Sequence, residues 1–262
     1  MMDRLLKFWQ AKKVVITGAS SGLGAALVGA LSSYQVHFCL LSRRVEPMQE
    51  LVARYSASGS RFWTRACDVK KREEVEAAIG AFVEEVGVPD VAWINSGVVG
   101  DTSFQYWKWD VVENIIDTNI KGALYTAHTC LRYMVPQKQG TVVAISSSAA
   151  MKGLGGRSIY SLSKVGLAYY MQSMAVELPE IQFTTIFPGF VDTPANRNNP
   201  NRFWLITAED AAQRMIRAVA YKKSTYIYPF KMNLLFHAIR ALPEFIYFPI
   251  ARRLMRMTRP GR

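Results

Sequence analysis

Short apolar runs alternate with longer helix-like segments along most of the chain. The apolar runs are rich in β-branched and aromatic residues and predict strands at Val14–Thr17, Val36–Leu41, Arg61–Ala66, Val91–Asn95, Thr141–Ser146, Phe183–Phe187 and Thr225–Tyr228. Helices are predicted between them, among others at Lys71–Val86, Val111–Met134, Ser158–Leu178 and Ala208–Tyr221. This alternation predicts an α/β fold, a doubly wound parallel sheet flanked by helices. Ligands of such folds bind at the carboxyl ends of the strands.

A glycine-rich turn follows the first predicted strand. It places Gly18, Gly22 and Gly24 directly before an apolar helix. Glycines let backbone N–H groups approach a ligand, and a helix N-terminus attracts a pyrophosphate. The spacing differs from the common G-x-G-x-x-G fingerprint, but the strand–turn–helix context still predicts a dinucleotide site. A purely structural turn is the alternative.

Tyr160 and Lys164 lie four residues apart in a predicted helix. That spacing puts both side chains on one face of the helix. A free phenol has a pKa of about 10, and a nearby ammonium favours the phenolate. The pair therefore predicts a group that exchanges protons near neutral pH. The alternative is an ordinary contact on a helix surface.

Several further motifs stand in a fixed order along the chain. They are Cys67-Asp68-Val69, Asn95-Ser96-Gly97, Asn119-Ile120-Lys121-Gly122, Ser146-Ser147-Ser148 and Pro188-Gly189-Phe190-Val191-Asp192-Thr193. Together with the glycine turn and the Tyr160–Lys164 pair, they resemble the short-chain dehydrogenase/reductase family from about residue 12 to about residue 228. One departure is Ile94, where the family commonly has an asparagine. It affects a structural hydrogen bond in the sheet, not the chemistry.

The resemblance implies a catalytic set of four residues. Ser147 would hydrogen-bond the substrate carbonyl oxygen, and Tyr160 would donate or accept the proton. Lys164 would lower the pKa of Tyr160 and hold the nicotinamide ribose, while Asn119 would support a water that links Lys164 to solvent. The resemblance also implies these cofactor-binding residues: Gly18, Ser20, Ser21, Gly22, Leu23, Gly24, Ser42, Arg43, Arg44, Asp68, Val69, Asn95, Ser96, Gly97, Tyr160, Lys164, Pro188, Gly189, Val191 and Thr193.

The end of the second predicted strand indicates which nicotinamide cofactor binds. NAD-preferring sites place an acidic residue there for the ribose 2′-hydroxyl. This chain instead has Ser42-Arg43-Arg44, with no acid before Glu46. Because a guanidinium suits a phosphate group, the sequence predicts NADP(H) over NAD(H). Loop arginines that only meet solvent are the alternative.

Composition agrees with one globular enzyme. The chain has 262 residues and 50% hydrophobic content, enough for a large core. Its cysteines, Cys39, Cys67 and Cys130, are scattered singly, which suggests neither a metal site nor a disulfide framework. A reducing compartment follows, and the N-terminus lacks the uninterrupted apolar core of a secretory signal. We therefore expect a cytoplasmic protein.

The last residues form a basic extension. We expect residues 1–230 to form the catalytic domain and residues 231–262 an amphipathic extension with seven basic residues and one acid, Glu244. Pro243 and Pro249 are expected to break the extension into short pieces. We expect these to pack beside the substrate mouth or at a subunit interface; the alternative is contact with an anionic membrane surface. No apolar run reaches the roughly 20 residues of a membrane span, and no nucleic-acid motif accompanies the charge.

These patterns lead to one expected function and one alternative. The expected function is an NADPH-dependent carbonyl reductase or alcohol dehydrogenase that acts on a ketone or aldehyde, apolar or acyl in character. The alternative is a non-catalytic NADP(H) sensor, or a membrane-recruited adaptor on the same fold. The resemblance also implies a homodimer or homotetramer built from the helices that carry Asn119 and Tyr160. The lid at residues 194–204 is predicted to be a loop, in which Phe203 and Trp204 contact substrate or anchor the loop.

Overall fold

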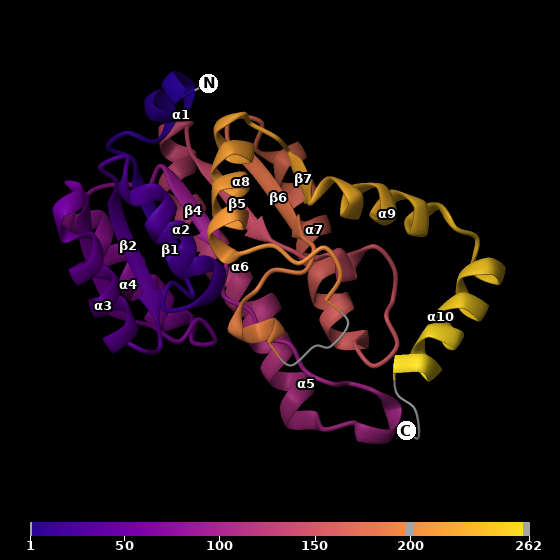
Figure 1. Ribbon diagram of the computed structural model, residues 1–262. Helices are drawn as coiled ribbons and strands as arrows, with labels where there is room; N and C mark the ends of the chain where they lie inside the picture. The colour runs from indigo at the N-terminus through magenta and orange to yellow at the C-terminus, as the bar shows by residue number, and fades with distance from the viewer. Residues whose placement is uncertain (1, 198–201, 259–262) are drawn as a thin grey trace.

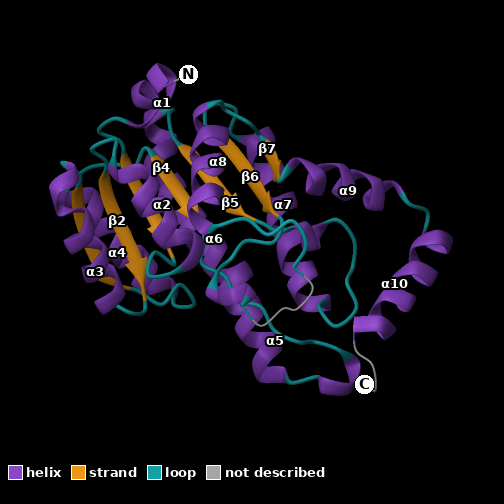
Figure 2. Cartoon of the chain, viewed as in Figure 1, coloured by secondary structure: helices purple, strands orange, loops and turns teal. Residues whose placement is uncertain are grey.

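The centre of the protein is a parallel sheet, seen in a computed structural model that describes residues 2–197 and 202–258. Seven strands follow the order β3-β2-β1-β4-β5-β6-β7 (Figures 1 and 2). All paired neighbours run parallel. The strands are β1 (Lys13–Thr17), β2 (His37–Ser42), β3 (Arg61–Ala66), β4 (Val91–Ile94), β5 (Thr141–Ile145), β6 (Gln182–Pro188) and β7 (Thr225–Tyr228). The predicted doubly wound sheet is confirmed, and each strand ends within one residue of its predicted bounds.

Helices cover both faces of this sheet (Figure 1). One face packs against α1 (Met2–Trp9), α2 (Gly22–Ser32), α3 (Glu46–Tyr55) and α8 (Ala208–Ala220). The other packs against α4 (Arg72–Glu85), α6 (Gly122–Met134) and α7 (Ser158–Glu177). Successive strand residues point to opposite faces, so Val14 and Ile16 enter the first core and Val15 the second. Burial on both faces explains why the strands are almost continuously apolar.

The helix predicted at Val111–Met134 is interrupted. α5 (Trp109–Ile116) and α6 are joined by a π-helical turn at Asp117–Lys121. Such turns are rare and occur frequently at functional sites. This one contains the predicted catalytic residue Asn119. The prediction of one regular helix is therefore wrong at this turn.

The C-terminal extension consists of two helices, α9 (Phe230–Ala241) and α10 (Glu244–Thr258). Met232 and Phe236 of α9 are buried in a small core with residues of β6 and β7. Pro249 lies inside α10 and does not end it, so that expected break is wrong. A proline removes its own N–H bond, and exposure at Pro249 leaves the freed carbonyl accessible to water.

Some predicted features lie beyond the part of the chain that the structure describes. They are lid residues 198–201 and the basic residues Arg259 and Arg262. Within the described ranges, none of the helices combines the length and hydropathy of a membrane-spanning segment.

Candidate active site

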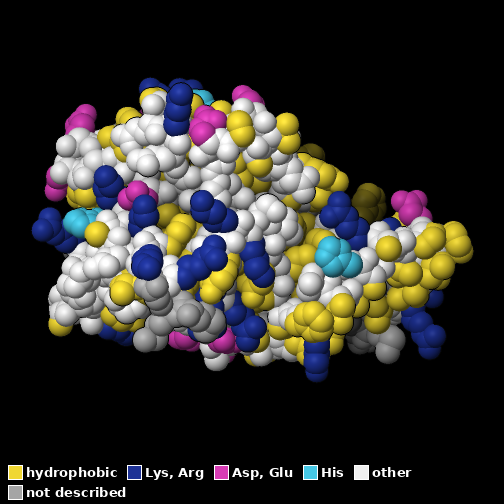
Figure 3. Space-filling model, turned by 90° about the horizontal axis from the view of Figure 1, so that it is seen from above, with side chains coloured by type: hydrophobic (Ala, Val, Ile, Leu, Met, Phe, Trp, Pro, Cys, Tyr) yellow, Lys and Arg dark blue, Asp and Glu magenta, His cyan; other side chains and the backbone are white. Residues whose placement is uncertain are grey.

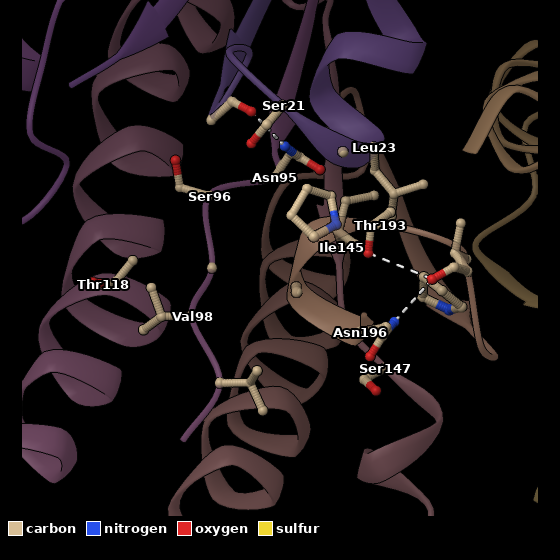
Figure 4. A pocket seen from close by; sticks show the side chains of 18 of the residues that line it. Ser21, Leu23, Asn95, Ser96, Val98, Thr118, Ile145, Ser147, Thr193 and Asn196 are labelled. Carbon is tan, nitrogen blue, oxygen red and sulfur yellow. Dashed lines mark hydrogen bonds between the residues drawn. The ribbon is translucent and has the colours of Figure 1, made fainter. Parts of the chain in front are cut away.

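A pocket of about 580 Å³ opens at the carboxyl edge of the sheet. In Figure 4, Ser21, Asn95 and Ser96 line one part of it, and Thr193 and Asn196 lie near Ser147 in another. Its lining contains Ser147, Tyr160 and Lys164, three of the four predicted catalytic residues. It also contains almost every predicted cofactor-binding residue: Gly18, Ser20, Ser21, Gly22, Leu23, Ser42, Arg43, Arg44, Asp68, Val69, Asn95, Ser96, Gly97, Pro188, Gly189, Val191 and Thr193.

Gly24 is a predicted cofactor residue that lies outside this lining. A Cβ atom there would lie 2.2 Å from the carbonyl oxygen of Gly18 and 2.8 Å from Nδ2 of Asn95. Atoms do not approach so closely, so only glycine lets the start of α2 pack against the turn after β1. Gly24 therefore supports helix–strand packing and does not face the ligand.

The turn after β1 is shaped to receive an anion. Gly18 and Gly22 have φ angles of 67° and 55°, in the left-handed region that favours glycine. Asn95 fixes the turn by donating from Nδ2 to the carbonyl oxygens of Thr17 and Gly18, at 2.9 and 3.3 Å. Ser21 stands at the N-cap of α2 without a side-chain cap bond. The first N–H groups of α2 thus remain available to a pyrophosphate, and the turn fits a dinucleotide.

Two hydrogen bonds hold α7 against the end of β5. Ser146 Oγ donates to the carbonyl oxygen of Lys164 at 2.8 Å. Lys164 Nζ donates in return to the carbonyl oxygen of Ile145, also at 2.8 Å. The residue after Ser146 is Ser147, so this clamp sets the serine hydroxyl opposite the α7 face that carries Tyr160 and Lys164.

Asn119 does not line the pocket but connects its walls. Its Oδ1 accepts from the backbone N–H of Val98 at 2.8 Å, and its Nδ2 donates to the Val98 carbonyl oxygen at 2.9 Å. Nδ2 also donates to Ser163 Oγ at 3.1 Å, and Ser163 in turn donates to the carbonyl oxygen of Tyr160 at 2.8 Å. Asn119 is 1% exposed. Its side chain is thus a positioning group that joins the segment after β4 to α7.

The electrostatics of Tyr160 differ from the expectation. Burial raises the pKa of the Tyr160 phenol above its usual value, while a hydrogen bond with Ser147 and the charge of Arg157 oppose that rise. Lys164 Nζ lies 5.8 Å from the Tyr160 ring centre and donates to a backbone carbonyl instead. Lys164 is not among the groups that shift the pKa of Tyr160 here, so its expected effect on the phenol stays a prediction. The phenol is therefore protonated at neutral pH, and burial makes it a weaker acid than a free tyrosine.

Lys164 is buried without an acidic partner. Its side chain is 5% exposed, and burial lowers its pKa to about 8. A Cβ atom at Gly97 would lie 3.3 Å from Lys164 Nζ and 3.5 Å from Asn119 Oδ1. A glycine at this position therefore leaves room around the amine. With a pKa near neutrality, Lys164 can pass a proton in either direction.

Comparison with known proteins assigns the family. Residues 12–202, most of the chain, match the family model of the short chain dehydrogenases. This protein is a short-chain dehydrogenase/reductase. An uncharacterized oxidoreductase of Myxococcus xanthus is 33% identical over 247 residues, which cover 93% of this chain and 97% of that protein. The predicted family and enzyme class are confirmed, and the chain is an oxidoreductase of a family that binds a nicotinamide cofactor.

Solved structures agree in fold. An alcohol dehydrogenase of Thermococcus sibiricus, in complex with 5-hydroxy-NADP, has a TM-score of 0.77 at 21% identity and covers 83% of this chain and 95% of that one. A short-chain dehydrogenase of Burkholderia phymatum, in complex with NAD, has a TM-score of 0.80 at 20% identity and covers 87% of this chain and 92% of that one. These two structures hold different cofactors, so the shared fold does not by itself fix the cofactor.

The residues predicted to choose the cofactor lie at the end of β2. Ser42 Oγ donates to Ser20 Oγ at 2.8 Å, and Arg44 Nη2 reaches the same oxygen at 3.4 Å. Arg43 and Arg44 are exposed at the pocket edge, and no acidic residue stands at the end of β2 itself; Asp68, which also lines the pocket, follows the neighbouring strand β3. This corner of the dehydrogenase joins two hydroxyls to two guanidinium groups, a donor set that suits a phosphate.

Two residues that line the substrate side were missed as site residues. Arg157 lies one turn before Tyr160 and donates from Nη1 to the carbonyl oxygen of Gly100 at 3.0 Å. Phe190 lines the pocket, and Phe203 packs on it with ring centres 4.9 Å apart. Phe203 thus anchors the lid. The three-residue spacing from Tyr160 could have pointed to Arg157, whereas nothing local to Phe190 marks its contact.

Proposed function

We propose that this short-chain dehydrogenase is an NADP(H)-dependent carbonyl reductase or alcohol dehydrogenase that acts on an apolar ketone or aldehyde. The observation that carries this proposal is the convergence of Ser147, Tyr160 and Lys164 in the pocket whose far corner holds Arg43. A proton donor and a phosphate-binding corner at two ends of one pocket are what such a reaction needs. The apolar wall at Phe190 and Leu154 favours an apolar substrate.

The residues divide the chemistry between them. When bound, the nicotinamide supplies the hydride for reduction or takes it in oxidation. Ser147 donates a hydrogen bond to the carbonyl oxygen and stabilises the charge that develops there. Tyr160, which is protonated at neutral pH, donates its proton to that oxygen. Lys164 restores the proton to Tyr160, and the Asn119 backbone, in its π-helical turn, holds the water through which Lys164 exchanges with solvent.

An assay of cofactor oxidation tests this function. Purified protein is given NADPH or NADH with a panel of aldehydes, aromatic ketones, steroids, acyl-thioesters and sugars. We expect turnover with NADPH on at least one apolar carbonyl. Tight NADPH binding without turnover on any member would favour the sensor or adaptor instead, and faster turnover with NADH would contradict the cofactor choice.

Alkaline pH should slow carbonyl reduction. The pKa of Lys164 is lowered to about 8, so the amine is protonated at neutral pH and loses its proton as the pH rises through that value. Because Lys164 reloads Tyr160, kcat for reduction should fall by about tenfold per pH unit above it, and kcat for alcohol oxidation should not. Measuring kcat against pH in both directions checks this. A reduction rate that stays level into the alkaline range would remove Lys164 from the proton path.

We also infer a homo-oligomer, a dimer or tetramer, built on α7. Leu162, Tyr169 and Val176 are 52%, 55% and 86% exposed. They recur every seven residues and so share one side of α7. On the same side, nothing lies within 4 Å of a Cβ atom placed at Gly166. An apolar stripe with a small residue at its centre suits close packing against the same helix of a second copy.

Tyr169→Asp should separate the subunits, because it would bury two charges in the paired interface. Light scattering after size-exclusion chromatography measures the mass. Leu234→Asp, at a similarly exposed leucine of α9, is the matched control and should leave the mass unchanged. If the wild-type protein is a monomer, the proposed oligomer does not exist. If only Leu234→Asp lowers the mass, the interface is formed by α9 and not by α7.

Finally, we propose that the enzyme works in the cytoplasm and that its C-terminal helices contact a membrane there. The NADPH pool of the cytoplasm favours reduction, and residues 231–262 supply six of the twelve net positive charges of the chain.

A further inference from the structure

α10 exposes apolar side chains over most of its surface. Phe245 is 77% exposed, Ile250 47% and Leu254 56%. Of the side chains described in this helix, Tyr247 is the buried one, at 8% exposure. A surface helix of a soluble protein normally turns its apolar stripe toward the core. Much of the apolar surface of α10 is not covered by its own chain.

Arginines stand among these apolar side chains. Arg252, Arg253 and Arg256 line a shallow groove with Pro249 on the outer side of α10. The Arg252 guanidinium lies 6.0 Å from the centre of the Phe248 ring. Glu244 is the sole acid from residue 231 to the end of the sequence. The helix therefore combines insertable apolar groups with uncompensated positive charge, as interfacial helices do.

α10 is fastened to the rim of the active-site pocket. Tyr247 donates its hydroxyl to the carbonyl oxygen of Gly153 at 2.6 Å. Lys152 Nζ donates to the carbonyl oxygen of Leu242, between the two helices, at 2.8 Å. A Cβ atom at Gly155 would lie 2.6 Å from the Met255 sulfur. Since Leu154 and Arg157 of the same rim line the pocket, α10 borders the substrate entrance.

Another apolar segment is bonded to this rim. The backbone N–H of Thr102 donates to the carbonyl oxygen of Gly156 at 3.0 Å. The residues after it end in a run of exposed aromatics: Phe104 (97%), Tyr106 (47%), Trp107 (39%) and Trp109 (67%). Figure 1 places this run and α10 on the same side, beyond the carboxyl edge of the sheet. Figure 3 shows hydrophobic and basic side chains gathered at the end of the molecule formed by α9 and α10.

We propose that this face, made of α9, α10 and residues 104–109, docks on an anionic membrane surface. We further propose that the substrate is an apolar carbonyl compound dissolved in that membrane, which enters the pocket from the lipid side; this second step rests on the proposed reaction. Aromatic and aliphatic groups enter the acyl boundary, while arginines bind lipid phosphates. A second copy is the weaker occupant, because a two-fold interface would bring the same arginines of both subunits together.

Vesicle sedimentation tests the docking surface without any turnover. We expect the full-length protein to bind vesicles of phosphatidylcholine mixed with phosphatidylglycerol, and to bind pure phosphatidylcholine much less. Reversing three charges in Arg252→Glu/Arg253→Glu/Arg256→Glu should weaken binding by about 100-fold or more. The control is Arg54→Glu/Arg61→Glu/Arg65→Glu, which makes the same charge change at exposed positions of α3 and β3. Absent binding, or equal losses in both variants, would overturn the proposal, as would a change of oligomeric mass in the α10 variant alone.

Kinetics test the substrate route. Hexadecanal dissolved in the mixed vesicles should be reduced with a kcat/KM at least about tenfold higher by the wild type than by the α10 variant. Butanal in solution should be reduced equally by both. Equal rates on hexadecanal would overturn the membrane route while leaving the reductase intact. If neither aldehyde is reduced with NADPH, both the proposed reduction of aldehydes and the proposed membrane substrate are rejected. Vesicle sedimentation then still tests the docking surface on its own.

Discussion

Tyr160→Phe should lower kcat for carbonyl reduction by about 10²–10⁴-fold, the range that loss of a positioned general acid produces. The substitution removes one oxygen from a side chain that lines the pocket and bonds Ser147. The ring remains, and so does the bond from Ser163 to the backbone carbonyl of residue 160. The fold and NADPH affinity should therefore stay nearly unchanged. Stopped-flow or steady-state NADPH oxidation gives kcat, and fluorescence titration gives the Kd for NADPH.

Tyr170→Phe provides the matched control. Tyr170 lies on the same helix, packs against the core between α7 and the sheet, and does not line the pocket. The control should keep wild-type kcat. If Tyr160→Phe kept it as well, the proton would have to come from water or from another residue, and the catalytic assignment would fail. If its Kd for NADPH rose in step with the loss of kcat, Tyr160 would be a binding residue rather than an acid.

The sheet could be predicted because its signal is local. Runs such as Val14–Ile16 are apolar on both sides of the strand, since each side enters a separate core. The turn after β1 could also be predicted from the sequence, because the left-handed φ values at Gly18 and Gly22 favour glycine. The family resemblance then added residues such as Ser147 and Val191, whose meeting in one pocket depends on the fold.

What could not be predicted depends on contacts far apart in the sequence. Asn119 forms hydrogen bonds with Val98 and Ser163, which are distant in the sequence. The residues around Asn119 therefore do not predict its place behind the pocket wall or its π-helical turn. The raised pKa of Tyr160 comes from burial, and the spacing to Lys164 predicted the opposite direction. Pro249 lies within a helix at an exposed position, which a rule based on residue type misses.

Arg43→Ala should raise the Kd for NADPH by about 10–100-fold and leave the Kd for NADH nearly unchanged. A hydrogen bond to a charged partner contributes about 1.5–3 kcal/mol, and the ribose 2′-phosphate that would accept it is present in NADPH alone. Arg43 is exposed at the pocket edge, where a phosphate can reach its guanidinium. Competition titration with both cofactors gives the two constants, and their ratio reports the phosphate contact directly.

Arg65→Ala is the control for a lost surface arginine. Arg65 pairs with Leu41 in the β2–β3 register and stays outside the pocket lining, so both affinities should hold. The neighbours of Arg43 determine how far the preference for NADPH over NADH falls in Arg43→Ala. Arg44 and Ser42 already meet at Ser20 Oγ, so they retain part of the phosphate site when Arg43 is lost. If the preference for NADPH, the Kd for NADH divided by the Kd for NADPH, is unchanged in Arg43→Ala but lowered in Arg44→Ala, the phosphate contact belongs to Arg44. If neither variant changes this preference, the two arginines do not cause it.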